Sequence, residues 1–167
     1  MKKLLLIRHA KSSWNDDSIN DKERHLNARG KKAAPFMAEM LKKKNLDIQL
    51  FICSPAERAF ATAKKFADVL GYPRNQIKII EDLYGAATYE IMDIVNALDN
   101  NLECVAIIGH NPDLTQFNNF LSDTYIDNIP TTGIVMLHFD VATWAEIGKG
   151  VGKLQFFDYP KKFNPLL

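Results

Sequence analysis

The chain has 167 residues, of which 47% are hydrophobic and 25% are charged, a balance typical of a globular protein with a sizeable core. Its formal net charge of +1 provides no global attraction to nucleic acid or to an anionic membrane surface, so any preference for an anion must be local. No apolar run approaches a membrane span or a secretory signal, and both cysteines lie in or beside apolar runs, as buried free thiols do. We therefore expect a cytoplasmic protein with one domain over residues 1–167.

Short apolar runs alternate with amphipathic stretches along the chain. The run at residues 4–7 has no polar alternation, which is typical of a strand buried on both faces of a sheet. Strands alternating with helices predict an α/β domain with a largely parallel sheet, and the last two strands, which alternate more, are expected near its edge. We expect strands at residues 4–7, 46–53, 77–80, 104–108, 134–139 and 151–157, helices at 27–44, 54–70, 88–98 and 114–121, and an irregular tail at 160–167.

Informative polar side chains follow three of the predicted strands. Arg8 and His9 end the first strand, and His110 follows the fourth after a glycine that permits close backbone approach. Ser54 follows the second strand, where it is expected to cap a helix, and Arg58 comes one turn later. A single such group is more often a solvated surface charge than a functional one. Because neighbouring parallel strands open into one crevice at their carboxyl ends, we expect these groups to converge there.

Two arginines and two histidines in one small volume fit the chemistry of a phosphoryl group. Its transition state spreads negative charge over three oxygens, which guanidinium groups match with paired hydrogen bonds. A neutral imidazole at His9 can attack phosphorus, and flanking guanidiniums favour its neutral form by like-charge repulsion. His110 is better suited to hold the oxygens as a protonated or hydrogen-bonding group. Helix starts at Ser54 and Asn111 would add amide donors.

The segments LLLIRHAKS, SPAERAFATA and IIGHNP resemble the signatures of the histidine phosphatase superfamily, and ERHLNARG resembles a loop element of its short, SixA-type phosphohistidine phosphatases. The resemblance covers nearly the whole chain. It implies a phosphoglycerate mutase-like fold, which is a three-layer α/β/α sandwich with a mostly parallel central sheet. It also implies an enzyme that needs no metal or other cofactor.

The resemblance assigns roles to individual residues. His9 matches the nucleophile that becomes transiently phosphorylated, Arg8 and Arg58 match the arginines that hold the phosphoryl oxygens, and His110 matches the second histidine of the pocket. Arg24 matches an additional phosphate contact of the SixA-type members, and Ser54 is expected to assist in substrate binding. His25 stands where the SixA-type pattern has proline, which leaves the reach of Arg24 open.

A second departure bears on the substrate. Larger family members carry an acidic proton donor in a pattern like L-x-E, whereas Leu83 and Tyr84 are followed here by Gly85. Asp16, Asp17, Asp21, Glu81 or Asp82 could substitute, although each is more often a surface charge. An alkoxide leaving group benefits from a general acid, whereas a protonated imidazole leaves easily. The missing acid, and a chain too short for a long lid, favour phosphohistidine on a protein, for example on a histidine-containing phosphotransfer domain.

Three other hypotheses remain open at this stage. The first is a small-molecule phosphomonoesterase of broad specificity with the same mechanism at His9, acting on a small phosphate compound. The second is a non-catalytic phosphate-binding module. The third is a cysteine-dependent phosphatase using Cys53 and Arg58, but these residues are separated by four residues where that family has five, and Glu57 would repel phosphate.

Overall fold

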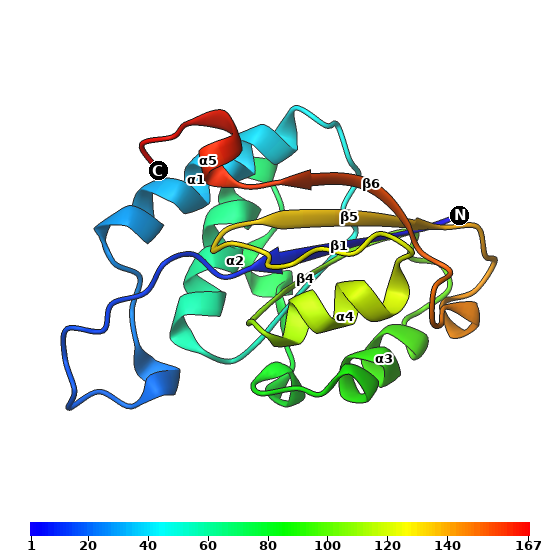
Figure 1. Ribbon diagram of the computed structural model, residues 1–167, viewed down its shortest axis with the longest axis horizontal. Coiled ribbons are helices and arrows are strands. Elements are labelled where there is room, and N and C mark those ends of the chain that lie inside the picture. Colours follow the sequence, from blue (N-terminus) through cyan, green and yellow to red (C-terminus); the bar gives the residue numbers. More distant parts are fainter.

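The computed structural model describes residues 1–167, and its six strands form one sheet in the order β3-β2-β4-β1-β5-β6 (Figure 1). β1, β2, β3 and β4 run parallel, while β5 lies antiparallel to both β1 and β6. The sheet is therefore mostly parallel, as predicted, with one antiparallel strand. The strands are β1 (Lys2–Arg8), β2 (Leu50–Cys53), β3 (Lys78–Ile79), β4 (Cys104–Gly109), β5 (Ile134–Phe139) and β6 (Lys153–Asp158).

Helices cover both faces of the sheet and complete a three-layer α/β/α sandwich, which confirms the predicted fold class (Figure 1). α1 and α2 pack on one face, and α3 and α4 pack on the other. No helix is both long enough and apolar enough to cross a lipid bilayer. The helices are α1 (Ala28–Lys42), α2 (Glu57–Leu70), α3 (Thr88–Asn96), α4 (Asp113–Leu121) and α5 (Pro160–Phe163), with 3-10 turns η1 (Asp21–Glu23), η2 (Arg74–Gln76), η3 (Glu81–Leu83) and η4 (Trp144–Glu146).

The apolar run of β1 is buried because its side chains pack into the hydrophobic cores on both faces of the sheet. Leu4 and Leu6 contribute to the core beneath α3 and α4, whereas Leu5 and Ile7 contribute to the core beneath α1 and α2. All four side chains are fully buried. Successive side chains of a strand point to opposite faces, so a strand buried on both faces cannot alternate in polarity.

The sheet register places the predicted site residues side by side. β4 lies between β1 and β2, and Arg8 pairs with Gly109 at the last position of the β1–β4 ladder. His9 and His110 follow these two residues directly, so both leave the sheet at the same edge. The backbone N–H of His9 also donates to the carbonyl of Gly109 at 3.0 Å.

Several elements differ from the sequence-based expectations. β2 begins at Leu50 rather than residue 46, and α2 begins at Glu57, whose N-cap Ala56 forms no side-chain cap. The predicted Ser54 cap is wrong because the N-cap position is Ala56; the Ser54 hydroxyl accepts from the backbone N–H of Ala56 and bonds His110. β5 and β6 lie at one edge of the sheet, as expected, but the expected irregular tail contains the helix α5.

Candidate active site

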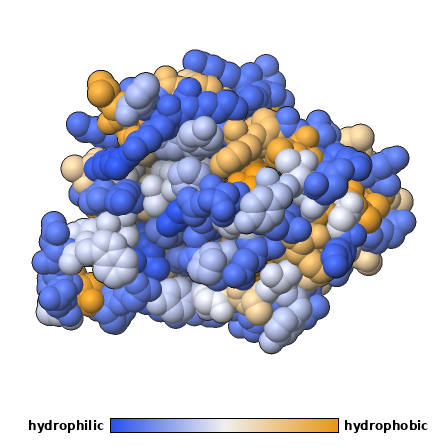
Figure 2. Space-filling view, in the orientation of Figure 1, coloured by the Kyte–Doolittle hydropathy of each residue, from blue (hydrophilic) through white to orange (hydrophobic).

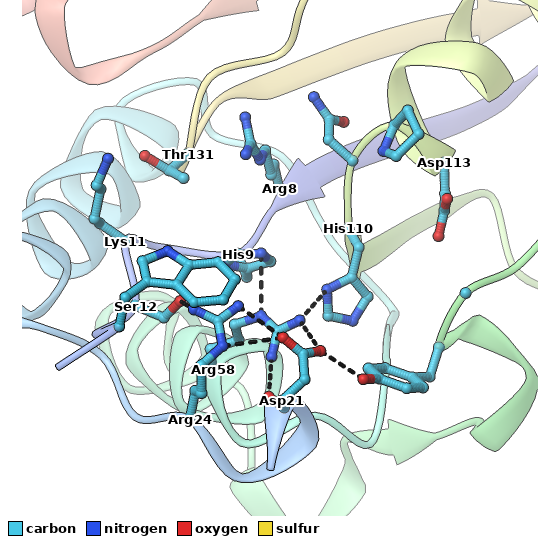
Figure 3. A pocket seen from close by; sticks show the side chains of 15 residues that line it. Arg8, His9, Lys11, Ser12, Asp21, Arg24, Arg58, His110, Asp113 and Thr131 are labelled. Carbon is cyan, nitrogen blue, oxygen red and sulfur yellow. Dashed lines mark hydrogen bonds and ion pairs between the residues drawn. The ribbon is translucent and has the colours of Figure 1, made fainter. Parts of the chain in front are cut away.

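A cavity of about 540 Å³ opens beyond the carboxyl ends of β1 and β4. In the orientation of Figure 1, hydrophilic colours dominate the left half of the surface, at this end of the sheet (Figure 2). Figure 3 shows the side chains that line the cavity, which come from β1 and the loop after it, η1, α2, the segment after η3, the start of α4 and the segment before β5. The lining residues are Arg8, His9, Lys11, Ser12, Trp14, Asp21, Arg24, Arg58, Tyr84, Gly85, His110, Asn111, Pro112, Asp113 and Thr131.

Hydrogen bonds define which nitrogen of His9 is the nucleophilic one. Its Nδ1 lies 2.8 Å from the carbonyl oxygen of Ala10, an atom that can only accept, so Nδ1 carries the proton. Nε2 therefore keeps its lone pair, and Arg58 Nε donates toward it at 3.3 Å. The backbone N–H of Ala10 donates to Thr62 Oγ1, and Thr62 in turn donates to the Arg58 carbonyl. This arrangement holds His9 and α2 together with Nε2 directed at the arginine.

Burial keeps the His9 imidazole neutral. The residue is 8% exposed, and loss of solvation lowers the pKa of its imidazole from 6.5 to about 3. Repulsion by His110, Arg58 and Arg8 lowers the pKa further, while the hydrogen bond to Ala10 opposes the shift. The predicted neutral state is therefore present, but the predicted cause is only secondary, because desolvation outweighs the guanidinium charges.

His110 lies beside His9, with the two ring centroids 5.1 Å apart. Its Nδ1 faces Arg58 Nη2 at 3.4 Å, and because a guanidinium can only donate, Nδ1 is the acceptor and Nε2 carries the proton. Nε2 then donates to Ser54 Oγ at 2.7 Å. Burial lowers the pKa of His110 to about 4, so it is a neutral hydrogen-bonding group in this pocket and not the protonated clamp that was one expectation.

Ser54 does not line the cavity. Its side chain is fully buried behind His110, where it orients the imidazole. A direct substrate contact, as predicted from the sequence, is therefore replaced by a positioning contact.

Gly109 has no steric requirement for glycine, since an added Cβ would lie at an ordinary 3.5 Å from Leu114. Gly30 is the glycine that this region requires, because an added Cβ would lie 2.1 Å from the Lys11 carbonyl oxygen.

Arg58 connects both histidines with a carboxylate. Its Nη2 lies 3.0 Å from Asp21 Oδ2, and its Nη1 donates to the Asp21 carbonyl oxygen at 2.6 Å. A hydrogen bond from Tyr84, together with Arg58 and Arg24, lowers the pKa of Asp21 to about 2, although the Asp21 side chain is 46% exposed. Asp21 is thus ionised at neutral pH and serves as the counter-ion of Arg58 (Figure 3).

Arg24 reaches the cavity even though His25 replaces the proline of the SixA-type pattern. Its guanidinium is buried, donates to Ser12 Oγ at 2.7 Å, and pairs with Asp21 at 3.0 Å. The Trp14 ring stacks on it, with 3.4 Å between the Arg24 Cζ and the ring centroid. In this arrangement protein groups already occupy its donors, so Arg24 also supports the loop that forms this wall of the pocket.

Among the three arginines that line the cavity, Arg8 has the fewest partners. Its Nη1 donates to the Ile129 carbonyl at 2.9 Å, its buried Nε has no partner, and it forms no ion pair. Desolvation lowers its pKa, which reflects the cost of burying a cation without a counter-charge. The cavity wall contains four cationic side chains and two carboxylates, so the pocket has an excess of positive charge that suits a phosphoryl dianion.

The structure brings together His9, Arg8, Arg58, His110 and Arg24, and the same cavity is lined by two carboxylates and two aromatic side chains. Asp21 was one of several candidate carboxylates, and nothing in its loop marked it above its neighbours. Asp113 was not singled out at all; it lies at the start of α4, and burial raises the pKa of its carboxyl group. Trp14 and Tyr84 also lie on the cavity wall.

The structure contradicts the cysteine-dependent hypothesis. Cys53 is fully buried in the core beneath α1 and α2, and desolvation raises the pKa of its thiol to about 12. A thiol with so little thiolate is a poor nucleophile. Cys104 is also buried and free, as predicted. No group of three or more His, Cys, Asp or Glu side chains is arranged to hold a metal ion.

Comparison with known proteins places this site in a family. The chain belongs to the histidine phosphatase superfamily (branch 1), whose family model matches residues 4–88. Membership of this family supports phosphatase activity. An uncharacterised protein of Mycobacterium tuberculosis is 26% identical over 165 residues, which cover 93% of this chain and all of that protein.

Solved structures share the fold at low sequence identity. The protein histidine phosphatase SixA in complex with tungstate matches with a TM-score of 0.84 and 21% identity, over 97% of this chain and 99% of that one. A mycobacterial glucosyl-3-phosphoglycerate phosphatase, bound to a vanadium oxyanion, matches with a TM-score of 0.69 and 14% identity, over 96% of this chain and 100% of that one. These likenesses confirm the phosphoglycerate mutase-like fold.

Proposed function

We propose that this protein is a phosphatase that hydrolyses phosphohistidine on another protein through a phosphorylated His9 intermediate. The observation that carries the proposal is the state of His9: a buried, neutral imidazole whose Nε2 lone pair faces the cavity beside guanidinium groups. A neutral nitrogen nucleophile next to fixed positive charge is suited to attack a phosphoryl dianion. Fully formed donors need little reorganisation as charge develops on the oxygens.

The reaction proceeds in two displacements. In the first, the Nε2 lone pair of His9 forms a bond to phosphorus, and the P–N bond to the substrate imidazole breaks with its electron pair going to that nitrogen. Arg8 and Arg58 hold the equatorial oxygens, and His110 adds a hydrogen bond once the dianion favours a proton on its ring. In the second, water attacks phosphorus, the bond to His9 Nε2 breaks, and the water proton passes to the released phosphate or to solvent. Neither step requires a metal or another cofactor.

The carboxylate beside Arg58 favours phosphohistidine as the substrate. Asp21 has a pKa of about 2 and pairs with Arg58 and Arg24, so it is not available as a proton donor at neutral pH. An alkoxide leaving group without a general acid leaves slowly, whereas an imidazole protonated on its second nitrogen leaves as a neutral base. The pocket wall therefore fits a nitrogen-linked phosphoryl group better than a sugar phosphate.

One observation supports a second candidate function, a small-molecule phosphomonoesterase with the same nucleophile. The Asp113 carboxyl group lines the cavity, accepts a hydrogen bond from the Ala86 backbone, and has a pKa raised by burial. A carboxyl group that holds its proton more tightly is a possible general acid for an alkoxide. The structural likeness to a glucosyl-3-phosphoglycerate phosphatase points in the same direction.

A substrate panel with two variants separates these functions. We expect turnover of a phosphorylated histidine-containing phosphotransfer domain and of phosphoramidate, loss of both in His9→Gln, and no change in Asp113→Asn. If sugar phosphates are the better substrates and Asp113→Asn slows them selectively, the phosphomonoesterase is the correct function. If no phosphoryl donor is turned over and none labels His9, the protein is a phosphate-binding module.

Because both free thiols are buried in reduced form, we further propose a cytoplasmic location.

A further inference from the structure

A second hollow adjoins the phosphoryl cavity. This side groove has a volume of about 140 Å³, and its lining includes Lys11, Arg29, Thr131, Tyr159, Lys161 and Leu167. Lys11 and Thr131 line both hollows, so the groove begins at the wall of the main cavity. Figure 3 shows these two residues on the side of the site opposite Asp113.

The groove is lined by three cationic side chains and by no acidic side chain. Lys11 and Lys161 form no ion pair, and Arg29 donates to the main-chain oxygen of Leu167 at 2.6 Å. Since the whole chain has a net charge of only +1, the gathering of three cationic side chains around one small hollow is a local feature.

The shape of the groove indicates the kind of ligand it holds. Its volume is enough for one or two small side chains and not for a folded element. Its floor combines buried Ala33 and Pro160 with the half-buried ring of Tyr159, which suits a methylene stem, while the cations at its rim suit a carboxylate. A glutamate or aspartate side chain meets both requirements.

We propose that the side groove binds a carboxylate side chain of the polypeptide that carries the phosphorylated residue, so that the enzyme prefers phosphoproteins with acidic residues near the phosphorylated position. This inference rests on the proposed function, since it assumes a protein substrate. The phosphoryl group would enter the main cavity, and the neighbouring carboxylate would lie between Lys161 and Arg29. A rim charge of this kind affects encounter and substrate selection more than the chemical step.

The test compares Lys161→Glu and Arg29→Glu with Lys149→Glu, an exposed cation in the loop before β6 that lines neither hollow. Acidic residues are well accommodated in the first turn of α1, where Arg29 lies, so the Arg29 variant should fold. Two phosphohistidine peptides serve as substrates, with either glutamate or glutamine at the three residues on each side, and phosphoramidate reports the chemical step alone.

At low ionic strength we expect each groove variant to reduce kcat/KM for the glutamate peptide about fivefold, and to leave the glutamine peptide and phosphoramidate unchanged. The Lys149→Glu control should retain the wild-type preference, and salt should abolish the difference between peptides. Equal turnover of both peptides by the wild-type enzyme, or loss of phosphoramidate turnover in the groove variants, would overturn the assignment. Failure of the wild-type enzyme on every phosphohistidine substrate would instead refute the proposed function.

Discussion

Acidification from pH 7 to pH 5 should destabilise the protein through its two pocket histidines. The pKa values of His9 and His110 in the folded protein are about 3 and about 4, against 6.5 for an exposed imidazole. Because both folded pKa values lie below the unfolded value, the contribution of these two histidines to the free energy of unfolding is fully present above pH 6.5. It is lost progressively as the pH falls toward 4 for His110 and toward 3 for His9. At pH 5 both rings are still neutral in the folded chain but protonated in the unfolded one.

The loss of stability depends on how far the pH lies below the pKa of the unfolded chain. A histidine that is protonated only in the unfolded chain lowers the free energy of unfolding by about 1.36 kcal/mol for each pH unit below its unfolded pKa. At pH 5 each of the two histidines therefore lowers it by about 2 kcal/mol. Their sum, about 4 kcal/mol, is a large part of the stability of a domain this size.

Urea denaturation at the two pH values measures this loss directly. His9→Gln and His110→Gln should each remove about 2 kcal/mol of the pH dependence, and His25→Gln, at an exposed position outside the cavity, should retain all of it. If His9→Gln has the same pH dependence as the wild-type protein, His9 is not held neutral by burial, and the reasoning about the nucleophile fails.

Three further predictions concern other groups of the site and core. Arg58→Ala should lower kcat/KM by about 100-fold and weaken inhibition by vanadate or tungstate; unchanged inhibition would remove this arginine from the anion site. Asp21→Asn should lower the free energy of unfolding at pH 7 by about 1 kcal/mol, less than a pKa of about 2 implies, because the side chain is 46% exposed; equal stability in urea denaturation would argue against its ion pairs in solution. Iodoacetamide should neither modify Cys53 and Cys104 in the folded protein nor change turnover, whereas loss of activity on alkylation, followed by mass spectrometry, would restore the cysteine hypothesis.

The residues at the strand ends were predictable because local signals define them. An apolar run buried on both faces has a clear end, so the positions of Arg8, His9 and His110 follow from the chain without knowledge of the sheet order. The insertion of β4 between β1 and β2, which places the two histidines side by side, depends on long-range pairing that no local pattern records.

Asp21 could not be distinguished from the other candidate carboxylates for a physical reason. It lies in the short turn η1 between β1 and α1, outside any strand, and its position depends on contacts with Arg58 and Tyr84. The surroundings of a side chain are equally hard to predict from the sequence. The neutral state of His9 was expected from neighbouring charges, but burial contributes more to its lowered pKa, and burial is known only from the packed structure.

Two predictions about helices were wrong because tertiary contacts override local sequence preference. Serine is a common N-cap residue, yet α2 begins three residues after Ser54, and the Ser54 hydroxyl accepts from the buried imidazole of His110 and from the backbone N–H of Ala56. By contrast, the alternation in the last two strands indicated the edge of the sheet, and β5 and β6 lie there. The tail forms α5 because Phe163 packs edge-on against Phe36, at 6.4 Å between ring centroids.

The central claim is that Nε2 of His9 accepts the phosphoryl group. Rapid quenching of the enzyme with phosphoramidate under alkaline conditions, followed by mass spectrometry, tests it most directly. We predict one phosphoryl group per chain, attached to His9, stable to alkali and lost in acid, and absent from the His9→Gln variant. Turnover without a phosphorylated His9, or a phosphoryl group trapped on any other residue, would contradict the mechanism.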